Sequence, residues 1–197
     1  MESPAWFVGM RPVFLFVDLL NDFFQQPPLS TQREALVRAV NELAVLARAA
    51  DCPIIWIRQE FEPDLSDAFL RMRETGRRVT IKGTDGCQLL AELKRQPADH
   101  VLVKKRYSAF FGTQLAQLLQ DLACTHLLIG GVNTQACVRA TAIDAYQMDY
   151  QIVFATEAIS SYDPEFHRES MRYLAQSIGT PMNNADIRRW LARQELD

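Results

Sequence analysis

The sequence predicts an α/β fold: a doubly wound, Rossmann-like αβα sandwich of three layers around a mostly parallel sheet of five or six strands. Two observations lead to this prediction. Short, almost uniformly apolar runs recur along the chain, and strands of this kind are typical of a parallel sheet that helices cover on both faces. Longer segments with apolar residues at helical spacing separate these runs, as expected for helices that connect parallel strands.

Strands are expected where the apolar runs lie. The first run, 13–17, ends in Asp18, and the second, 54–57, follows directly after Pro53. Three later runs of the same kind complete the set: 101–103, 127–129 and 152–154.

Helical spacing is clearest between about 33 and 50, where Leu36, Val40 and Leu43 belong to one apolar stripe. With the strands on either side, this helix completes a first βαβ unit by Arg58. Further helices are expected at 112–123, at 134–148 and from about Asp186 onward.

The alternation of strands and helices is interrupted between about 60 and 99. We expect one domain, 1–197, in which this segment is an excursion over the edge of the sheet. Excursions in compact domains are often functional covers, and a decorated crossover without a function is the alternative. The residues that break weak helical patterns there are Pro63, Gly76, Gly83, Gly86 and Pro97.

Composition excludes several classes of protein. The 24 acidic and 21 basic residues give a formal net charge of -3, so there is no basic surplus to bind nucleic acid or an anionic membrane. No apolar stretch approaches the roughly 20 residues that cross a bilayer, and the first residues lack the pattern of a secretory leader. We therefore expect a cytoplasmic protein whose partner is a small-molecule substrate.

Neither a metal nor a cofactor is expected. No HxH, HxxxH or Asp-x-His grouping is present, and phosphate-binding glycine patterns are absent after the first apolar run. The four cysteines form no CxxC pair: Cys52, Cys87, Cys124 and Cys137. We therefore expect a reaction that the side chains of the protein carry out without a metal or a cofactor.

Polar residues directly after the apolar runs are the candidates for this chemistry, because ligands bind outside the carboxyl ends of the strands in an open parallel sheet. Asp18 follows the first run, and Lys104, Lys105 and Arg106 follow the third. After the fourth run, Gly130-Gly131 permits a tight turn into a helix, and Cys137 is expected near the N-terminus of that helix. There the helix dipole lowers the pKa of a thiol, and backbone N–H groups stabilise an oxyanion.

Each of these residues also has a purely structural interpretation. Cysteine is among the residue types most often buried as an inert thiol, an Asp after a strand is a suitable helix N-cap, and a single lysine is usually exposed. Brought together, Asp18 would act as a general base toward the Cys137 thiol. Lys104 would orient the carboxylate and favour the thiolate.

The three histidines offer a competing base. His100 and His126 precede expected strands and should therefore lie at the amino end of the sheet, away from the candidate site. His167 follows the fifth run and is expected nearer the site, so it is the second choice of base.

Three blocks of sequence, in this order, resemble the isochorismatase-like cysteine hydrolases. They are 16–24 (FVDLLNDFF), 103–113 (VKKRYSAFFGT) and 131–141 (GVNTQACVRAT). The elements between the blocks match the family in order and type, so the resemblance covers roughly residues 12–180. It implies a doubly wound parallel sheet and a Cys-Asp-Lys catalytic triad.

The resemblance places this triad on Asp18, Lys104 and Cys137. It also implies a cis peptide bond between Val132 and Asn133, and an oxyanion hole formed by the N–H groups of Asn133 and Cys137. The implied reaction is attack of the Cys137 thiolate on a carbonyl carbon, followed by loss of an amine that Asp18 protonates. Water activated by Asp18 then cleaves the thioester.

The sequence determines the substrate less closely. Relatives in this family include nicotinamidases, N-carbamoylsarcosine and ureidoacrylate amidohydrolases, and isochorismatases. Nicotinamidases carry an Asp-x-His metal motif after the second strand, where this chain has the residues RQEFE at 58–62, and this departure argues against nicotinamidase activity and its metal. We expect cleavage of a C–N bond in a linear amide or ureide. The alternatives are an isochorismatase-type vinyl-ether hydrolase and a non-catalytic small-molecule-binding member of the fold.

Several residues near the expected site are candidates for substrate contacts. Aromatic residues there are alternatively core or subunit contacts. Arg58 and Arg139 are considered as carboxylate anchors because a guanidinium donates two parallel hydrogen bonds, with a solvated surface position as the alternative. The substrate-contact candidates are Phe23, Gln59, Tyr107 and Phe110.

A homo-oligomer, a dimer or a tetramer, is the expected assembly. Relatives in the family commonly assemble in this way. In addition, some apolar residues are expected to lie outside a single core: Phe61, Phe69, Trp190 and Leu191.

Overall fold

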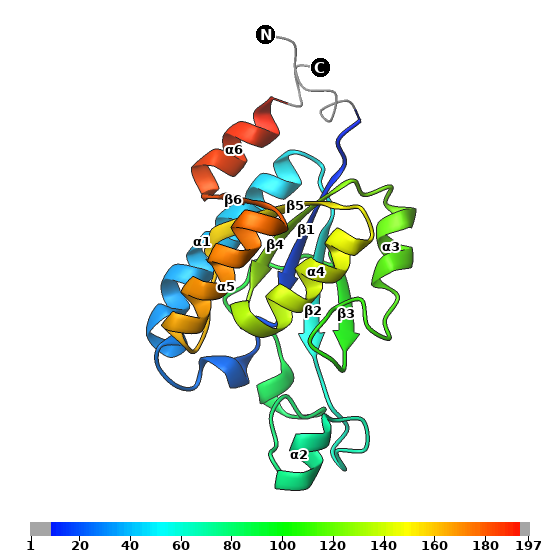
Figure 1. Cartoon of the computed structure of the whole chain (residues 1–197), viewed down its shortest axis with the longest axis vertical. Coiled ribbons are helices and arrows are strands. Elements are labelled where there is room, and N and C mark those ends of the chain that lie inside the picture. Colours follow the sequence, from blue (N-terminus) through cyan, green and yellow to red (C-terminus); the bar gives the residue numbers. More distant parts are fainter. Residues whose placement is uncertain (1–8, 194–197) are drawn as a thin grey trace.

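Six parallel strands form one sheet in the order β3-β2-β1-β4-β5-β6 (Figure 1). This is a computed structural model that describes residues 9–193. The chain runs outward from β1 to β3 on one side and from β4 to β6 on the other, so the strand order reverses between β1 and β4. The predicted doubly wound sheet is therefore confirmed. The strands are β1 (Pro12–Val17), β2 (Ile54–Gln59), β3 (His100–Lys104), β4 (His126–Gly131), β5 (Gln151–Ile159) and β6 (Thr180–Met182).

Helices cover both faces of this sheet (Figure 1). Because successive side chains of a strand point to opposite faces, β1 contributes Phe14 and Phe16 to one core and Leu15 and Val17 to the other. All six residues of β1 are buried, as its uniform apolar run predicts. The first core lies under α1 (Leu29–Ala49) and α6 (Asn184–Ala192), and the second under α3 (Leu115–Asp121), α4 (Arg139–Gln147) and α5 (Pro164–Ser177).

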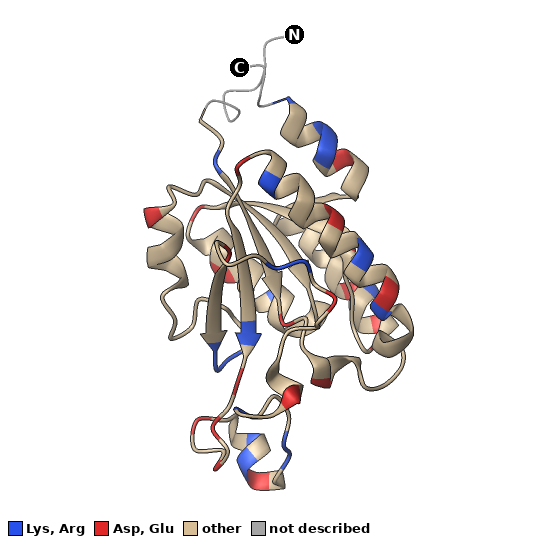
Figure 2. Ribbon diagram, turned by 180° about the vertical axis from the view of Figure 1, so that it is seen from behind, with Lys and Arg blue, Asp and Glu red and all other residues tan. Residues whose placement is uncertain are grey.

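Charged residues lie mainly on the helices and loops, whereas the strands are almost free of them (Figure 2). The exceptions visible at the ends of β2 and β3 are basic, and they correspond to Arg58 and Lys104. No helix within residues 9–193 has the length and the apolar character needed to cross a membrane.

Helix α5 and strand β6 were not predicted from the sequence. The start signal of α5 is clear in the structure, since the Asp163 carboxylate accepts hydrogen bonds from the Glu165 and Phe166 N–H groups and Pro164 occupies the first helical position. The buried face of α5 is narrow, because only Ser170 and Leu174 are fully enclosed. Strand β6 has only three residues and no apolar run. Strand β6 is therefore too short to show a strand pattern. Helix α5 does carry an apolar stripe, Met171, Leu174 and Ile178, which our prediction did not use.

The excursion between β2 and β3 lies beyond the carboxyl ends of these strands, where Figure 1 shows its helix α2 (Leu70–Thr75). It has a small core of its own, formed by Phe61, Leu65, Ala68, Met72 and Ile81. Several contacts attach it to the rest of the molecule. Among them, the Thr80 N–H donates to Asp22 Oδ2 (2.6 Å), and Lys105 pairs with Asp67 (2.8 Å).

The sequence led us to expect four apolar residues outside a single core, and the structure places each of them in or against a hydrophobic cluster. Trp190 and Leu191 belong to the core under α1 and α6, and Phe61 belongs to the small core of the excursion. Phe69 is partly buried against that small core. The expectation that they lie outside a single core is therefore wrong for Trp190 and Leu191, whereas Phe61 and Phe69 do lie outside the two main cores. Homo-oligomer formation stays a prediction.

Gly131 is expected to be intolerant of any side chain. Its φ is +124°, and a Cβ built there would lie 2.1 Å from the carbonyl oxygen of Val17 on the neighbouring strand. We expect Gly131→Ala to reduce the free energy of unfolding by about 3 kcal/mol or more, because β4 must move away from β1. Urea denaturation at neutral pH measures this loss.

Gly112 is the matched control for this substitution. Its φ is also positive, at +66°, but a Cβ there would meet nothing within 4 Å. Gly112→Ala should therefore cost only about 1 kcal/mol, the penalty of the left-handed conformation itself. Equal losses in the two variants would contradict the steric explanation.

Candidate active site

The carboxyl ends of three strands bring Asp18, Lys104 and Cys137 into contact. Asp18 follows β1, Lys104 ends β3, and Cys137 lies in the turn after β4. The Lys104 ammonium lies 2.6 Å from Asp18 Oδ2 and donates to Cys137 Sγ at 3.3 Å. Residues separated by more than a hundred positions in the sequence thus form one cluster.

Asp18 is fully buried and has a backbone φ of 53°. Aspartate is among the few residue types that adopt this left-handed conformation readily. Its N–H donates to the Ile57 carbonyl (3.0 Å), and its own carbonyl accepts from the Leu20 N–H (2.8 Å), which fixes the backbone. The alternative role as an N-cap is wrong, because the short 3₁₀ helix that follows begins after Leu20.

Lys104 is only 1% exposed, so the interpretation as an ordinary surface lysine is wrong. An ammonium has three donors, and each has a partner here: Asp18, Cys137 and the Arg106 carbonyl (3.0 Å). Burial alone lowers the pKa of this amine, but the Asp18 carboxylate and the Cys137 sulfur together raise the pKa of Lys104 above its usual value. Lys104 therefore stays charged in the resting protein.

Cys137 lies in a π-helical turn, Thr134–Val138, that leads into α4. It is 3% exposed, but it lines a cavity. Burial raises the pKa of the Cys137 thiol, the negative charge of Asp18 raises it further, and Lys104 lowers it by less. The expectation of a lowered thiol pKa is wrong, because desolvation and the Asp18 carboxylate outweigh the Lys104 ammonium. The resting group is a neutral thiol beside a carboxylate.

The turn that carries Cys137 is held by several hydrogen bonds. The peptide bond between Val132 and Asn133 is cis. The Asn133 side-chain oxygen accepts from the Tyr162 N–H (3.1 Å), and the Thr134 hydroxyl donates to the Ser160 carbonyl (2.9 Å). Asn133 and Cys137 line the same cavity, which is the arrangement that a shared oxyanion hole requires.

The histidines lie away from this cluster. His100 begins β3 and His126 begins β4, so both are at the amino end of the sheet, as predicted. His167 Nδ1 lies 2.7 Å from the Thr134 hydroxyl and is not among the residues that line the cavity of Cys137. The structure thus gives His167 a supporting contact with the turn instead of a position beside the thiol.

The cavity beside Cys137 has a volume of about 410 Å³, within the usual size of small-molecule sites. Three of the four predicted substrate contacts line it: Phe23, Gln59 and Tyr107. Phe110 does not, because its side chain is buried in the core under α3 and α4, with its ring stacked against Tyr150. That part of the prediction is wrong.

Most of the remaining cavity wall was not found from the sequence. Tyr162 and Ala136 come from the loops after β5 and β4. The excursion contributes most of these additional lining residues. The only indication of this in the sequence was the interruption of the alternation of strands and helices between about 60 and 99. These residues of the excursion are Phe69, Arg71, Met72, Thr75, Arg77 and Val79.

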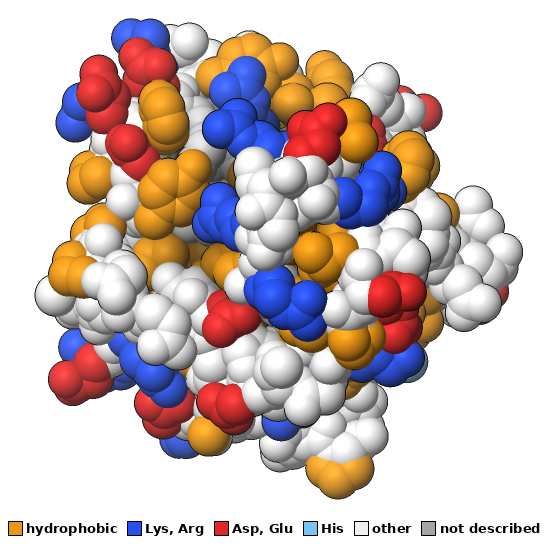
Figure 3. Space-filling model, turned by 90° about the horizontal axis from the view of Figure 1, so that it is seen from below, with side chains coloured by type: hydrophobic (Ala, Val, Ile, Leu, Met, Phe, Trp, Pro, Cys, Tyr) orange, Lys and Arg blue, Asp and Glu red, His pale blue; other side chains and the backbone are white. Residues whose placement is uncertain are grey.

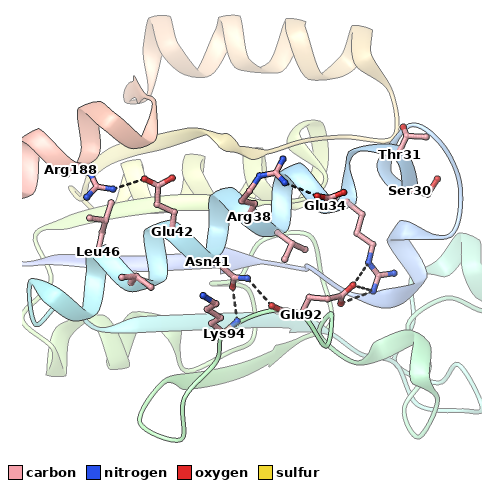
Figure 4. A pocket seen from close by; sticks show the side chains of 13 residues that line it. Ser30, Thr31, Glu34, Arg38, Asn41, Glu42, Leu46, Glu92, Lys94 and Arg188 are labelled. Atoms are coloured by element: carbon pink, nitrogen blue, oxygen red, sulfur yellow. Dashed lines mark hydrogen bonds and ion pairs between the residues drawn. The ribbon is translucent and has the colours of Figure 1, made fainter.

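A larger cavity of about 800 Å³ runs along the outer side of α1 (Figure 4). Its lining includes none of the three residues of the Asp18 cluster. Apart from Lys94, the charged side chains in it pair with one another, so their charges are largely compensated. The pairs are Arg33 with Glu92, Arg38 with Glu34, and Arg188 with Glu42.

The segment after β2 carries its own charge pairs. Glu60 pairs with Arg58 (2.5 Å), and Glu62 pairs with Lys82 (2.8 Å). Within residues 9–193, no group of three or more His, Cys, Asp or Glu side chains is placed to hold a metal ion. Arg139 lies over the ring of Tyr173 at 4.6 Å. Because Arg58 and Arg139 are engaged in this way and do not line the cavity, their consideration as carboxylate anchors is wrong.

Comparisons with known proteins agree with this architecture. Residues 12–186 match the family model of the isochorismatase domain. A probable inactive nicotinamidase of Arabidopsis thaliana is 34% identical over 161 residues, which cover 78% of this chain and 82% of that protein.

Two solved structures are similar over most of their length. An isochorismatase family protein from Desulfovibrio vulgaris superposes with a TM-score of 0.82 and 28% identity, covering 93% of this chain and 100% of that one. An N-carbamoylsarcosine amidase from Thermoplasma acidophilum superposes with a TM-score of 0.76 and 25% identity, covering 89% and 97%. With the match of the family model, these similarities show that the chain belongs to the isochorismatase family of hydrolases.

Proposed function

We propose that this protein is a cysteine-dependent amidohydrolase that cleaves a C–N bond of a small linear amide or ureide through a thioester. One observation carries the proposal: a single buried ammonium, Lys104, contacts both the Asp18 carboxylate and the Cys137 sulfur beside a cavity. A nucleophile, a base and a fixed positive charge in contact are the elements of nucleophilic catalysis.

The first half of the reaction forms the thioester. Asp18 accepts the proton of the Cys137 thiol as the sulfur attacks the carbonyl carbon of the substrate. The charge of Lys104 stabilises the developing thiolate, and the N–H groups of Asn133 and Cys137 stabilise the oxyanion. Asp18 then gives the proton to the leaving nitrogen, the C–N bond breaks, and the amine departs.

The second half releases the acid. Water enters beside the thioester, and Asp18 takes one of its protons while the hydroxide attacks the carbonyl carbon. When the C–S bond breaks, the proton returns to sulfur, and the neutral thiol of the resting protein is restored. Lys104 keeps its charge throughout, in accord with its raised pKa.

Among the relatives, the similarity to an N-carbamoylsarcosine amidase supports the choice of C–N cleavage. The similarity to a probable inactive nicotinamidase makes a direct assay essential. The pairing of Glu60 and Glu62 with cations of the chain itself supports a reaction in which these carboxylates hold no metal.

A panel of linear amides and ureides tests the proposal. We expect the purified protein to release ammonia or another amine from at least one of them, with each turnover giving one equivalent of acid. Pyruvate from an enol-pyruvyl ether in place of an amine would show vinyl-ether hydrolysis instead. Saturable stabilisation by a ligand in a thermal shift assay, with no product after prolonged incubation, would show a binding protein.

A further inference from the structure

Two arginines and a glutamine in the cavity wall have side-chain donors with no partner among residues 9–193. We propose that the substrate carries a carboxylate in addition to its scissile amide, and that Arg71 and Arg77 bind this carboxylate. The inference rests on the proposed function, since it assigns the substrate class of the same cavity.

The charge of the cavity wall is the first observation. Among the described residues, its lining includes Arg71 and Arg77 and no acidic residue. Seen from the carboxyl end of the sheet, basic side chains border apolar ones near the centre of the face (Figure 3). A cavity lined by charges of one sign concentrates ligands of the other sign.

The freedom of these two guanidinium groups is the second observation. Elsewhere in the same region, Arg73 donates to the Ala68 carbonyl, and Arg106 donates to the Asp67 carbonyl. Among residues 9–193, neither Arg71 nor Arg77 takes part in an ion pair or in a side-chain hydrogen bond. Both side chains are thus available to a ligand.

The local fold explains why both arginines reach the cavity. Arg71 and Thr75 are four residues apart in α2, so they share the face of the helix that lines the cavity. Gly76 ends α2 with a left-handed φ of 67°, and the Arg77 N–H then donates to the Met72 carbonyl (3.1 Å). This turn brings Arg77 back to the cavity that Arg71 lines.

Gln59 supplies a third donor, independent of the arginines. It lies at the end of β2, is 4% exposed and lines the same cavity. Within the part of the chain that the structure describes, its buried Nε2 has no hydrogen-bond acceptor. A buried donor without a partner is unfavourable, and a ligand rich in acceptor oxygens relieves this. A carboxylate is an acceptor-only group, so a carboxylate and a carbonyl on one molecule match this set of donors.

Aromatic rings fix the wall next to these donors. The rings of Phe69 and Tyr107 lie 4.8 Å apart, and the Arg106 guanidinium lies 5.3 Å from the centre of the Phe69 ring. The cavity of about 410 Å³ therefore suits a small molecule with a short apolar segment between its amide and its carboxylate.

Matched pairs of substrates test this assignment. Succinamate, glutaramate and adipamate carry one amide and one carboxylate, whereas the corresponding diamides carry no charge. The wild-type protein should cleave the best amide acid with a kcat/KM at least about tenfold above that of its diamide. A phosphonate analogue cleaved faster than the amide acid would overturn the assignment of a carboxylate.

Three single variants distinguish binding of the carboxylate by Arg71 and Arg77 from a nonspecific effect of positive charge near the cavity. Arg71→Gln and Arg77→Gln should each lower kcat/KM for the amide acid about tenfold, mainly through KM, and should lower kcat/KM for the diamide much less. Arg78→Gln removes the same charge one residue away, at a position that does not line the cavity, and should change neither substrate. Equal losses for the amide acid and the diamide, or equal effects in all three variants, would overturn the inference.

Binding to Cys137→Ala separates this inference from the proposed function. Calorimetry with that variant should show the amide acid binding about tenfold more tightly than the diamide, and Arg77→Gln in the same background should remove the preference. This result supports the carboxylate site even when the wild-type protein cleaves no amide. Equal binding of the two compounds contradicts the carboxylate site even when both are cleaved.

Discussion

Cys137→Ala is expected to lower kcat for amide hydrolysis by at least about 10⁴-fold, because removal of a catalytic nucleophile leaves only binding and oxyanion stabilisation. The substitution should leave the protein folded. The resting thiol is neutral, so its loss does not disturb the charge balance of the Asp18–Lys104 ion pair. Initial rates of amine release measure the loss, and circular dichroism reports the fold.

Cys124→Ala is the matched control for this prediction. Cys124 lies before β4, at the amino end of the sheet, and lines no part of the cavity of Cys137. Its replacement should leave kcat within about twofold of the wild-type value.

Acid quenching during turnover should also trap an acyl group on Cys137, detectable by mass spectrometry. More than a tenth of the wild-type kcat in Cys137→Ala would rule out this thiol as the nucleophile.

Lys104→Met is expected to reduce the free energy of unfolding by about 3–5 kcal/mol and to abolish hydrolysis. Both side chains of the Asp18–Lys104 pair are 0% exposed, so the substitution leaves a buried carboxylate without a compensating charge. It also removes the donor that contacts the Cys137 sulfur. Urea denaturation at pH 7 measures the first effect, and amine release measures the second.

A second substitution separates charge from packing in this prediction. Asp18→Asn combined with Lys104→Met removes both charges, and this double variant should recover most of the lost stability without recovering activity. Lys105→Met breaks the partly exposed pair with Asp67 and should cost less than about 1 kcal/mol. If the single and double variants at Asp18 and Lys104 were equally unstable, uncompensated charge would not be the cause.

The protonation of the cluster changes how the chemistry begins. The sequence led us to expect a stabilised thiolate, whereas burial and Asp18 raise the pKa of Cys137. Reaction therefore starts from a neutral thiol and a carboxylate, and the proton moves only when a carbonyl group is present to accept the attack.

Much of the fold was predictable because its signal is local. The apolar runs at 13–17, 54–57 and 127–129 fall within β1, β2 and β4, since a strand buried on both faces needs apolar residues throughout. Asp18 was found because the end of a parallel strand is a place that the sequence itself marks. The same position offered Lys104 and Lys105, and the resemblance to the family favoured Lys104.

The sequence by itself therefore determined five of the six strands, the doubly wound sheet and the three residues that meet at its carboxyl end. Only the tertiary structure decided that Phe110 packs into a core, that the excursion supplies Arg71 and Arg77 to the cavity, and that the Cys137 thiol is neutral. The physical reason is that strand burial follows from the pattern of neighbouring residues. The direction of a side chain and the pKa of a group depend on atoms brought close from distant parts of the chain.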